Sequence, residues 1–149
     1  SEGNIHDITH LSCVWTYAKT IGELEGLDAE TRFILEVAAI THDIACPLCR
    51  KKYGNTNGSY QEQEGDPLVR EFLADTGMTA AQIDRVAYLV GHHHSPAQID
   101  GIDYQILIEA DYIVNASESG YSRQAIQSFM EHTMKTAAGI RLTKTVFDV

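Results

Sequence analysis

Apolar residues recur at helical spacing through most of the chain. Leu11, Val14, Ala18 and Ile21 follow one another at intervals of three or four residues, and Gly26 provides a stop for this first helix. Further helices are expected where a capping side chain precedes another apolar run, at Asp28, Asp66, Thr79, Asp103 and Ser122. The pattern therefore predicts an all-α protein, folded as a compact bundle of about six helices.

Two segments depart from this pattern. Residues 45–65 contain Cys-Pro-Leu-Cys, a basic triplet and a run rich in glycine and asparagine, which together predict a long irregular loop. A loop of this length inside a compact domain is uncommon and often functional. The last ten residues alternate weakly between polar and apolar, so we expect them to be extended.

Length and composition narrow the class of protein. The 149 residues suit one domain over 1–149, and the formal charge is 11 − 21 = −10. This acidic balance argues against a protein that coats long nucleic acids or binds an anionic membrane, because both need a basic face. No apolar run approaches the roughly 20 residues needed to span a bilayer. Three cysteines, an odd number, favour reduced thiols and a cytoplasmic protein. The sequence is also compatible with a homodimer.

Several polar side chains stand at positions that the helical pattern assigns to the interior. Asp111 lies four residues after Leu107 and three before Val114, within the apolar stripe of its helix. A buried carboxylate is costly unless it is paired or binds a cation. The same exception recurs elsewhere, at His10, His42, Asp43, His92 and His93.

Imidazole and carboxylate groups are ligands of divalent metals such as Fe, Mn, Ni, Zn or Mg. A single buried histidine is usually a hydrogen-bonded core residue, but one shared cation accounts for all of these exceptions together. The residues therefore favour a metal site built from several helices.

The order of these residues resembles the HD-domain metal-dependent phosphohydrolase superfamily, and within it the small, stand-alone bacterial HD proteins. The motifs that carry the resemblance are His10, His42-Asp43 in Ala-Ala-Ile-Thr-His-Asp-Ile, His92-His93, and Asp111 in Glu-Ala-Asp-Tyr-Ile-Val-Asn. The metal ligands that it implies are His10, His42, Asp43 and Asp111. It also implies that Asp43 bridges to a second ion, that the tandem His92-His93 contributes to that ion, and that all three of these residues take part in catalysis.

The chain departs from the pattern of binuclear relatives at two positions. Gln61, four residues before Gly65, stands where those relatives have a histidine, and Cys46 stands where many have a lysine. A neutral amide is a weaker ligand than imidazole, which leaves one or two ions as alternatives. Glu62 or Glu64 is then either a further ligand or a solvated acid.

Without a lysine at that position, the phosphate of a substrate would be neutralised by Arg50, Lys51 or Lys52. The resemblance thus implies a metal-dependent phosphohydrolase that uses metal-activated water on a small phosphorylated substrate, either a nucleotide or another phosphomonoester or phosphoanhydride. Two alternatives stay open. One is a catalytically weak sensory or regulatory module that binds a metal or a nucleotide, and the other is a helical interaction domain without metal.

Other residues keep two interpretations each. Cys46 and Cys49 form a Cys-x-x-Cys pair, but a closed zinc site needs four ligands and no second pair lies nearby, so structural thiols are favoured. His94 either supports the metal site or faces solvent. Four tyrosines either line a pocket and stack on a base or belong to the core: Tyr53, Tyr60, Tyr104 and Tyr112.

Overall fold

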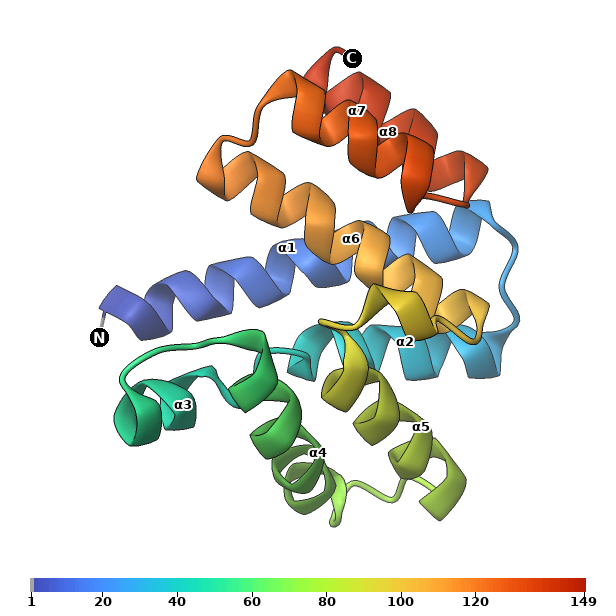
Figure 1. Cartoon of the computed structure of the whole chain (residues 1–149). Coiled ribbons are helices and arrows are strands. Elements are labelled where there is room, and N and C mark those ends of the chain that lie inside the picture. The colour runs from blue at the N-terminus through green and yellow to red at the C-terminus, as the bar shows by residue number, and fades with distance from the viewer. Residues whose placement is uncertain (1) are drawn as a thin grey trace.

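The computed structural model describes residues 2–149, and every regular element in that range is a helix (Figure 1). In chain order the elements are α1 (Glu2–Leu24), α2 (Ala29–Thr41), α3 (Cys46–Tyr53), α4 (Gly58–Leu73), α5 (Ala80–His92), the 3-10 helix η1 (Pro96–Gln98), α6 (Ile102–Ser119), α7 (Arg123–His132) and α8 (Ala137–Phe147). The all-α prediction is confirmed, although the helices α1 to α8 exceed the predicted number of about six. None of these helices is both long and apolar enough to cross a membrane.

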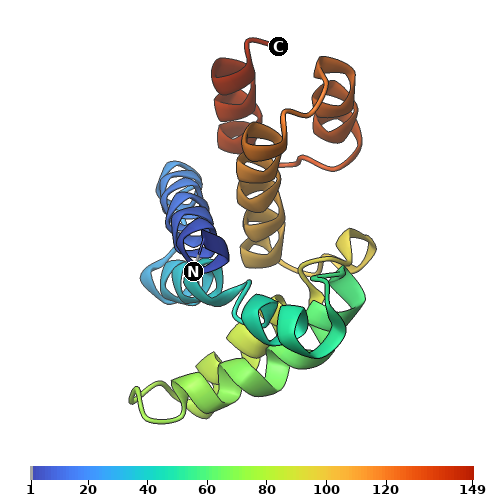
Figure 2. The same cartoon turned by 90° about the vertical axis from the view of Figure 1, so that its left-hand side faces the viewer.

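Four helices enclose the core. Helix α2 packs against α1, α5 and α6, and α1 also packs against α6. Their facing side chains, among them Val14, Leu35, Leu89 and Leu107, are completely buried. Helices α3 and α4 lie on one side of this core and α7 and α8 on the opposite side, as both views show (Figures 1 and 2).

The predicted helix boundaries at two N-termini are confirmed by their capping hydrogen bonds. The Asp28 carboxylate accepts from the backbone N–H of Thr31 at 2.7 Å, so α2 begins at the next residue. Thr79 and Gln82 form a reciprocal capping box at the start of α5. Gly26 takes a φ of +72° in the turn between α1 and α2, a conformation that costs glycine little.

The predicted loop over 45–65 is largely wrong, because this segment contains α3 and the first half of α4. Pro47 lies in the first turn of α3, where its missing N–H costs no hydrogen bond, and Gly54 ends that helix with a φ of +75°. The helix start expected at Asp66 is wrong, because α4 begins at Gly58 and both Asp66 and Pro67 lie inside it. Because proline has no backbone N–H, the carbonyl of Gln63 receives no helical hydrogen bond from Pro67. Both residues are exposed, so this carbonyl faces solvent.

The helix predicted to begin after Ser122 is α7; a second helix, α8, follows it, so the expected extended C-terminus is helical. The break follows from a buried carboxylate on α6. Glu109, completely buried, accepts from the backbone N–H groups of Lys135 and Thr136 at 2.9 and 3.2 Å. Thr136 then caps α8 by accepting from the backbone N–H of Gly139 at 2.9 Å. Any side chain at Gly139 would collide with the Glu109 carboxylate.

Candidate metal centre

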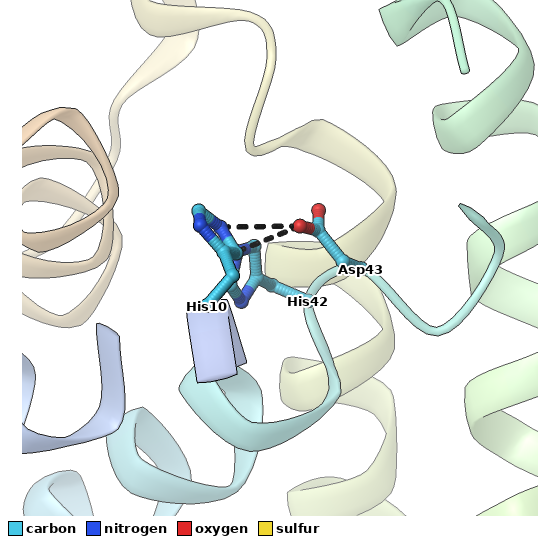
Figure 3. Close-up of side chains that lie close together, drawn as sticks. All are labelled: His10, His42 and Asp43. Atoms are coloured by element: carbon cyan, nitrogen blue, oxygen red, sulfur yellow. Dashed lines mark hydrogen bonds and ion pairs between the residues drawn. The ribbon is translucent and has the colours of Figure 1, made fainter. Parts of the chain in front are cut away.

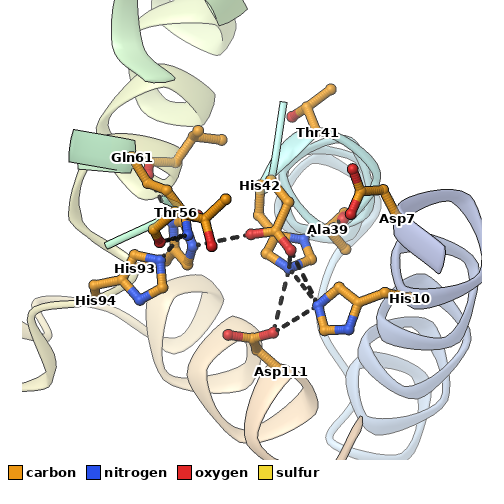
Figure 4. Close-up of polar contacts among 12 residues, drawn as sticks. Asp7, His10, Ala39, Thr41, His42, Thr56, Gln61, His93, His94 and Asp111 are labelled. Atoms are coloured by element: carbon orange, nitrogen blue, oxygen red, sulfur yellow. Dashed lines mark hydrogen bonds and ion pairs between the residues drawn. The ribbon is translucent and has the colours of Figure 1, made fainter. Parts of the chain in front are cut away.

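Four polar side chains converge between the core helices. His10 comes from α1, His42 and Asp43 from the end of α2, and Asp111 from α6 (Figures 3 and 4). Nε2 of His10 lies 3.1 Å from Oδ1 of Asp111 and 3.2 Å from both Oδ2 of Asp43 and Nε2 of His42. Nε2 of His42 lies 3.2 Å from Oδ1 of Asp111 and 3.4 Å from Oδ2 of Asp43. The structure therefore brings together the four residues that the resemblance assigns to one metal.

The outer nitrogens of the two rings define their tautomers. Nδ1 of His10 donates to Oε1 of Glu118 at 3.1 Å, and Nδ1 of His42 donates to the backbone carbonyl of Ala39 at 2.7 Å. In the neutral rings, each Nε2 then carries a lone pair and points it at the other ring and at two carboxylates. The His10 and His42 residues are 5% and 1% exposed, so bulk water does not separate the lone pairs.

A divalent cation fits this donor set. Ligands about 2.0–2.2 Å from a common ion lie about 3.0–3.5 Å from one another, and the five distances given above fall in this range. Two imidazoles and two carboxylates suit metals of intermediate to hard character. Carboxylate and carbonyl partners on the outer nitrogens are the arrangement that usually orients metal-bound histidines.

In the absence of a cation, protons neutralise the cluster. Burial disfavours the charged imidazolium of His10, but hydrogen bonds and charge from Asp111 and Asp43 outweigh it and raise its pKa to about 11. Burial opposes the charge on His42 as well, yet the same two carboxylates raise the pKa of His42 to about 9. Burial disfavours ionised carboxylates too, but the neighbouring histidines hold the pKa values of Asp43 and Asp111 below their ordinary range.

Raising the pH is expected to destabilise the metal-free protein. A histidine whose pKa is raised on folding contributes its full stabilisation below the unfolded value, near 6.5, and loses it as the pH rises through the folded value. For His42 and His10 the folded values are about 9 and about 11. The urea midpoint of chelator-treated protein should therefore fall between about pH 6.5 and about pH 11.

A His42→Asn variant controls for the lysines, tyrosines and cysteines that also titrate at alkaline pH. The wild-type midpoint should fall more steeply with pH than that of the variant. Parallel curves would contradict the stabilisation of the metal-free fold by protons bound in the cluster. Asp43 and Asp111 act in the opposite direction, because their lowered pKa values stabilise the fold above about pH 3.8 and this contribution is lost only on acidification.

Glu118 is a site residue that the sequence interpretation missed. It lies seven residues after Asp111 on α6, and Asn115 stands between them at helical spacing, so all three face the same pocket. That spacing of polar residues along a largely buried helix was the available signal.

Replacing Glu118 by glutamine is expected to weaken metal binding about 10- to 100-fold, because the His10 ring loses a charged acceptor that fixes its tautomer. Competition with a chromophoric chelator measures this affinity. A Glu131→Gln variant on the exposed face of α7 is the matched control and should bind metal like the wild type. Equal affinities for both variants would contradict the role of Glu118.

A second group of possible ligands adjoins the first through Asp43. Oδ1 of Asp43 lies 3.5 Å from Nε2 of His93, and one ligand atom each of Asp43, His93 and His94 fall within 4.8 Å of one another. Nδ1 of His93 donates to the carbonyl of Val90 at 2.7 Å, which leaves its buried Nε2 without a hydrogen-bond partner among the described residues. An orphaned buried lone pair beside a carboxylate fits a second cation bridged by Asp43.

The tandem histidines are placed one residue later than the resemblance suggested. His92 is the last residue of α5, donates from Nδ1 to the carbonyl of Tyr88 at 2.7 Å, and stacks on the Tyr88 ring with centroids 4.1 Å apart. The structure does not bring it to the cluster. His93 and His94 are the consecutive pair that approaches Asp43.

Gln61 supports the second group from outside. Its Nε2 donates to the carbonyl of Thr56 at 2.6 Å, and its Oε1 accepts from Nε2 of His94 at 3.0 Å (Figure 4). Glu62 instead accepts from the Ser95 hydroxyl at 2.7 Å. Glu64 binds Lys52 and Tyr53 and is likewise not brought to the cluster.

The basic triplet divides between the site and the surface. Arg50 lines the pocket above the metal cluster, and its guanidinium makes two hydrogen bonds of 2.7 Å to the Asp7 carboxylate. Lys51 is exposed, and Lys52 pairs with Glu64 at 2.7 Å; neither lines this pocket. Cys46 also lines the pocket, and burial raises the pKa of its thiol, so the thiol stays protonated.

The chain was compared with known proteins in three ways. A search of curated proteins and a search of solved structures gave no match. A family model, described as HD domain, matches residues 7–120. This segment contains both groups of possible ligands and makes up most of the chain, which confirms the resemblance seen in the sequence. The chain therefore belongs to the HD domain family, whose members are typically metal-dependent hydrolases.

Proposed function

We propose that this protein is a metal-dependent phosphohydrolase that cleaves a small phosphorylated substrate. The observation that carries the proposal is the convergence of four possible ligand atoms beside a pocket that also contains one arginine. When both imidazoles are neutral and both carboxylates are ionised, none of these four atoms carries a proton. Membership of the HD domain family supports the hydrolytic chemistry.

The ligand roles follow from the geometry of the cluster. His10, His42, Asp43 and Asp111 would hold one ion, and Asp43 with His93 and His94 would hold a second. A divalent cation in such a site lowers the pKa of a coordinated water from about 15.7 towards neutrality and withdraws charge from a phosphoryl oxygen. The outer partners, the Glu118 carboxylate and the buried Ala39 carbonyl, would keep the two histidine rings oriented for that task.

The reaction itself needs only water as co-reactant. A water oxygen forms a bond to phosphorus and loses a proton, the bond between phosphorus and the leaving oxygen breaks, and the leaving oxygen gains a proton. Arg50 stands at the pocket wall, where its charge would neutralise the phosphoryl oxygens during this transfer. Positioning and charge neutralisation supply most of the catalysis in such reactions.

The test is phosphate release by protein stripped with a chelator and reloaded separately with Mn, Fe, Ni, Zn or Mg. We expect turnover only after reloading, and loss of turnover in a His42→Ala variant. His132→Ala is the matched control, because His132 is an exposed histidine of α7 outside this pocket. Metal binding without turnover on any phosphoester would favour the sensory module, and no metal binding would remove both metal-based functions.

A further inference from the structure

We infer that the substrate of this site is a compact phosphomonoester, with one phosphoryl group and a small leaving group, and not a nucleotide. The inference rests on the proposed function and narrows it. Three features of the pocket carry it: its volume, the residue types that line it, and the balance of charge around it.

The pocket above the metal cluster is small. Its volume is about 180 Å³, whereas sites for drug-sized ligands usually measure about 300–1,000 Å³. Part of its wall consists of the ligands themselves, so that a phosphoryl group near the ions already occupies part of this volume. The rest of its wall comes from α1, α3, α4, α6 and the α3–α4 loop, and includes Asp7, Arg50, Thr56 and Glu118.

The pocket lacks a large aromatic or aliphatic surface for a base. Its described lining contains no Tyr, Phe or Trp and no large aliphatic side chain. Stacking on an aromatic ring contributes about 1–3 kcal/mol per base in proteins that bind single-stranded nucleic acids, and hydrophobic walls usually enclose organic ligands. A base entering this pocket would meet small polar groups, one guanidinium and one thiol, and no broad apolar wall.

The tyrosines that were candidates for stacking are engaged elsewhere. Tyr53 and Tyr60 stack on each other with centroids 3.9 Å apart. Tyr112 stacks on Phe129 at 3.5 Å, and Tyr104 is completely buried in the core. These contacts leave no ring of the four lining the metal-centre pocket.

The charges around the pocket match a single phosphoryl group. Arg50 is the one lysine or arginine among the described lining residues, and Asp7 already holds it through two hydrogen bonds. Asp7 and Glu118 place two carboxylates at the same wall. A second or third phosphate, as in a nucleoside diphosphate or triphosphate, would face these acids without a cation of its own. Asp7 therefore acts as a positioning residue that directs Arg50 towards one phosphoryl group.

The experiment compares substrates on the metal-loaded protein. Phosphate release is measured for glycerol phosphate, ethanolamine phosphate and phosphoserine, and for adenosine and thymidine monophosphates and ADP. We expect kcat/KM for the best compact ester to exceed that of every nucleotide by at least about tenfold. Calorimetric titration with inorganic phosphate and with adenosine monophosphate adds a readout that does not need turnover, and phosphate should bind more tightly.

The outcomes separate the inference from the proposed function. Nucleotide hydrolysis that equals or exceeds that of the compact esters, and that is lost in His42→Ala, would overturn the inference while leaving the phosphohydrolase in place. Absence of turnover together with tighter binding of phosphate than of the nucleotide would support the pocket's selectivity and contradict the hydrolase. Absence of turnover with equal binding, or with no binding at all, would contradict both.

Substitutions at two neighbouring residues of α3 test whether Arg50 binds the phosphoryl group. Arg50→Ala should raise KM for the compact ester about 10- to 100-fold, the loss expected when a charged hydrogen-bonding partner is removed. Lys51→Ala removes the same charge from an exposed neighbour outside the pocket and should leave KM unchanged. Equal effects of the two substitutions would show that only the general charge of α3 matters, and would overturn the anchoring role of Arg50.

Discussion

An Asp43→Ala variant is expected to lose its bound metal and to turn over substrate at least about a thousandfold more slowly. Asp43 is the residue shared by both groups of ligands, because Oδ2 faces His10 and His42 while Oδ1 faces His93. Its removal deprives each group of a carboxylate. A metal ion stabilises transition-state charge by several kcal/mol, and about 4 kcal/mol corresponds to a thousandfold in rate.

Metal content by elemental analysis and phosphate release under saturating substrate measure the two effects separately. Asp75→Ala, which removes an exposed carboxylate from the turn after α4, is the control and should keep metal and rate. Circular dichroism establishes that both variants are folded. Full metal content and wild-type turnover in folded Asp43→Ala would contradict the site as described.

A Glu109→Ala variant is expected to lower the free energy of unfolding by about 3–5 kcal/mol. The completely buried carboxylate accepts hydrogen bonds from the Gln105 amide and the Thr136 hydroxyl at 2.6 Å each, and from two backbone N–H groups at the break between α7 and α8. Alanine would remove the acceptor of the buried Thr136 hydroxyl and backbone N–H, while the Gln105 amide would keep only its hydrogen bond to the Thr133 carbonyl. Gly139 packs directly on the same carboxylate, so a cavity would also form.

Urea unfolding of the metal-loaded protein measures the effect, with Glu71→Ala on the exposed face of α4 as the control. Glu109→Gln should fall between the two, because its amide keeps the volume and one acceptor oxygen but turns an N–H group towards the donors. A change below about 1 kcal/mol in Glu109→Ala would show that the C-terminal helices dock by apolar contacts alone.

The sequence sufficed for the features that depend on local pattern. Apolar periodicity and capping side chains predict helices with the correct ends at Asp28 and Thr79, because a cap involves residues only three positions apart. The convergence of His10, His42 and Asp111 was predictable for another reason. Each interrupts an apolar stripe, and the stripes of different helices must meet in one core.

Features determined by contacts distant in sequence were not predictable in this way. The break before α8 depends on Glu109, twenty-six residues before Lys135, which receives the backbone N–H groups that would otherwise continue the helix. Which of the three consecutive histidines lies near Asp43 depends on where α5 ends, since successive side chains on a helix point about 100° apart. An error of one residue at that helix end moves a different ring into the site.

Helix α6 connects parts of the molecule that the family model separates. It directs Asp111 and Glu118 to the metal centre and Glu109 to the α7–α8 break, which lies beyond the matched residues 7–120. A bound ion and the docked helices α7 and α8 would therefore both stabilise α6 in the same position. By thermodynamic linkage, an ion that stabilises α6 is expected to slow hydrogen exchange in α7 and α8, and detachment of these two helices is expected to weaken ion binding.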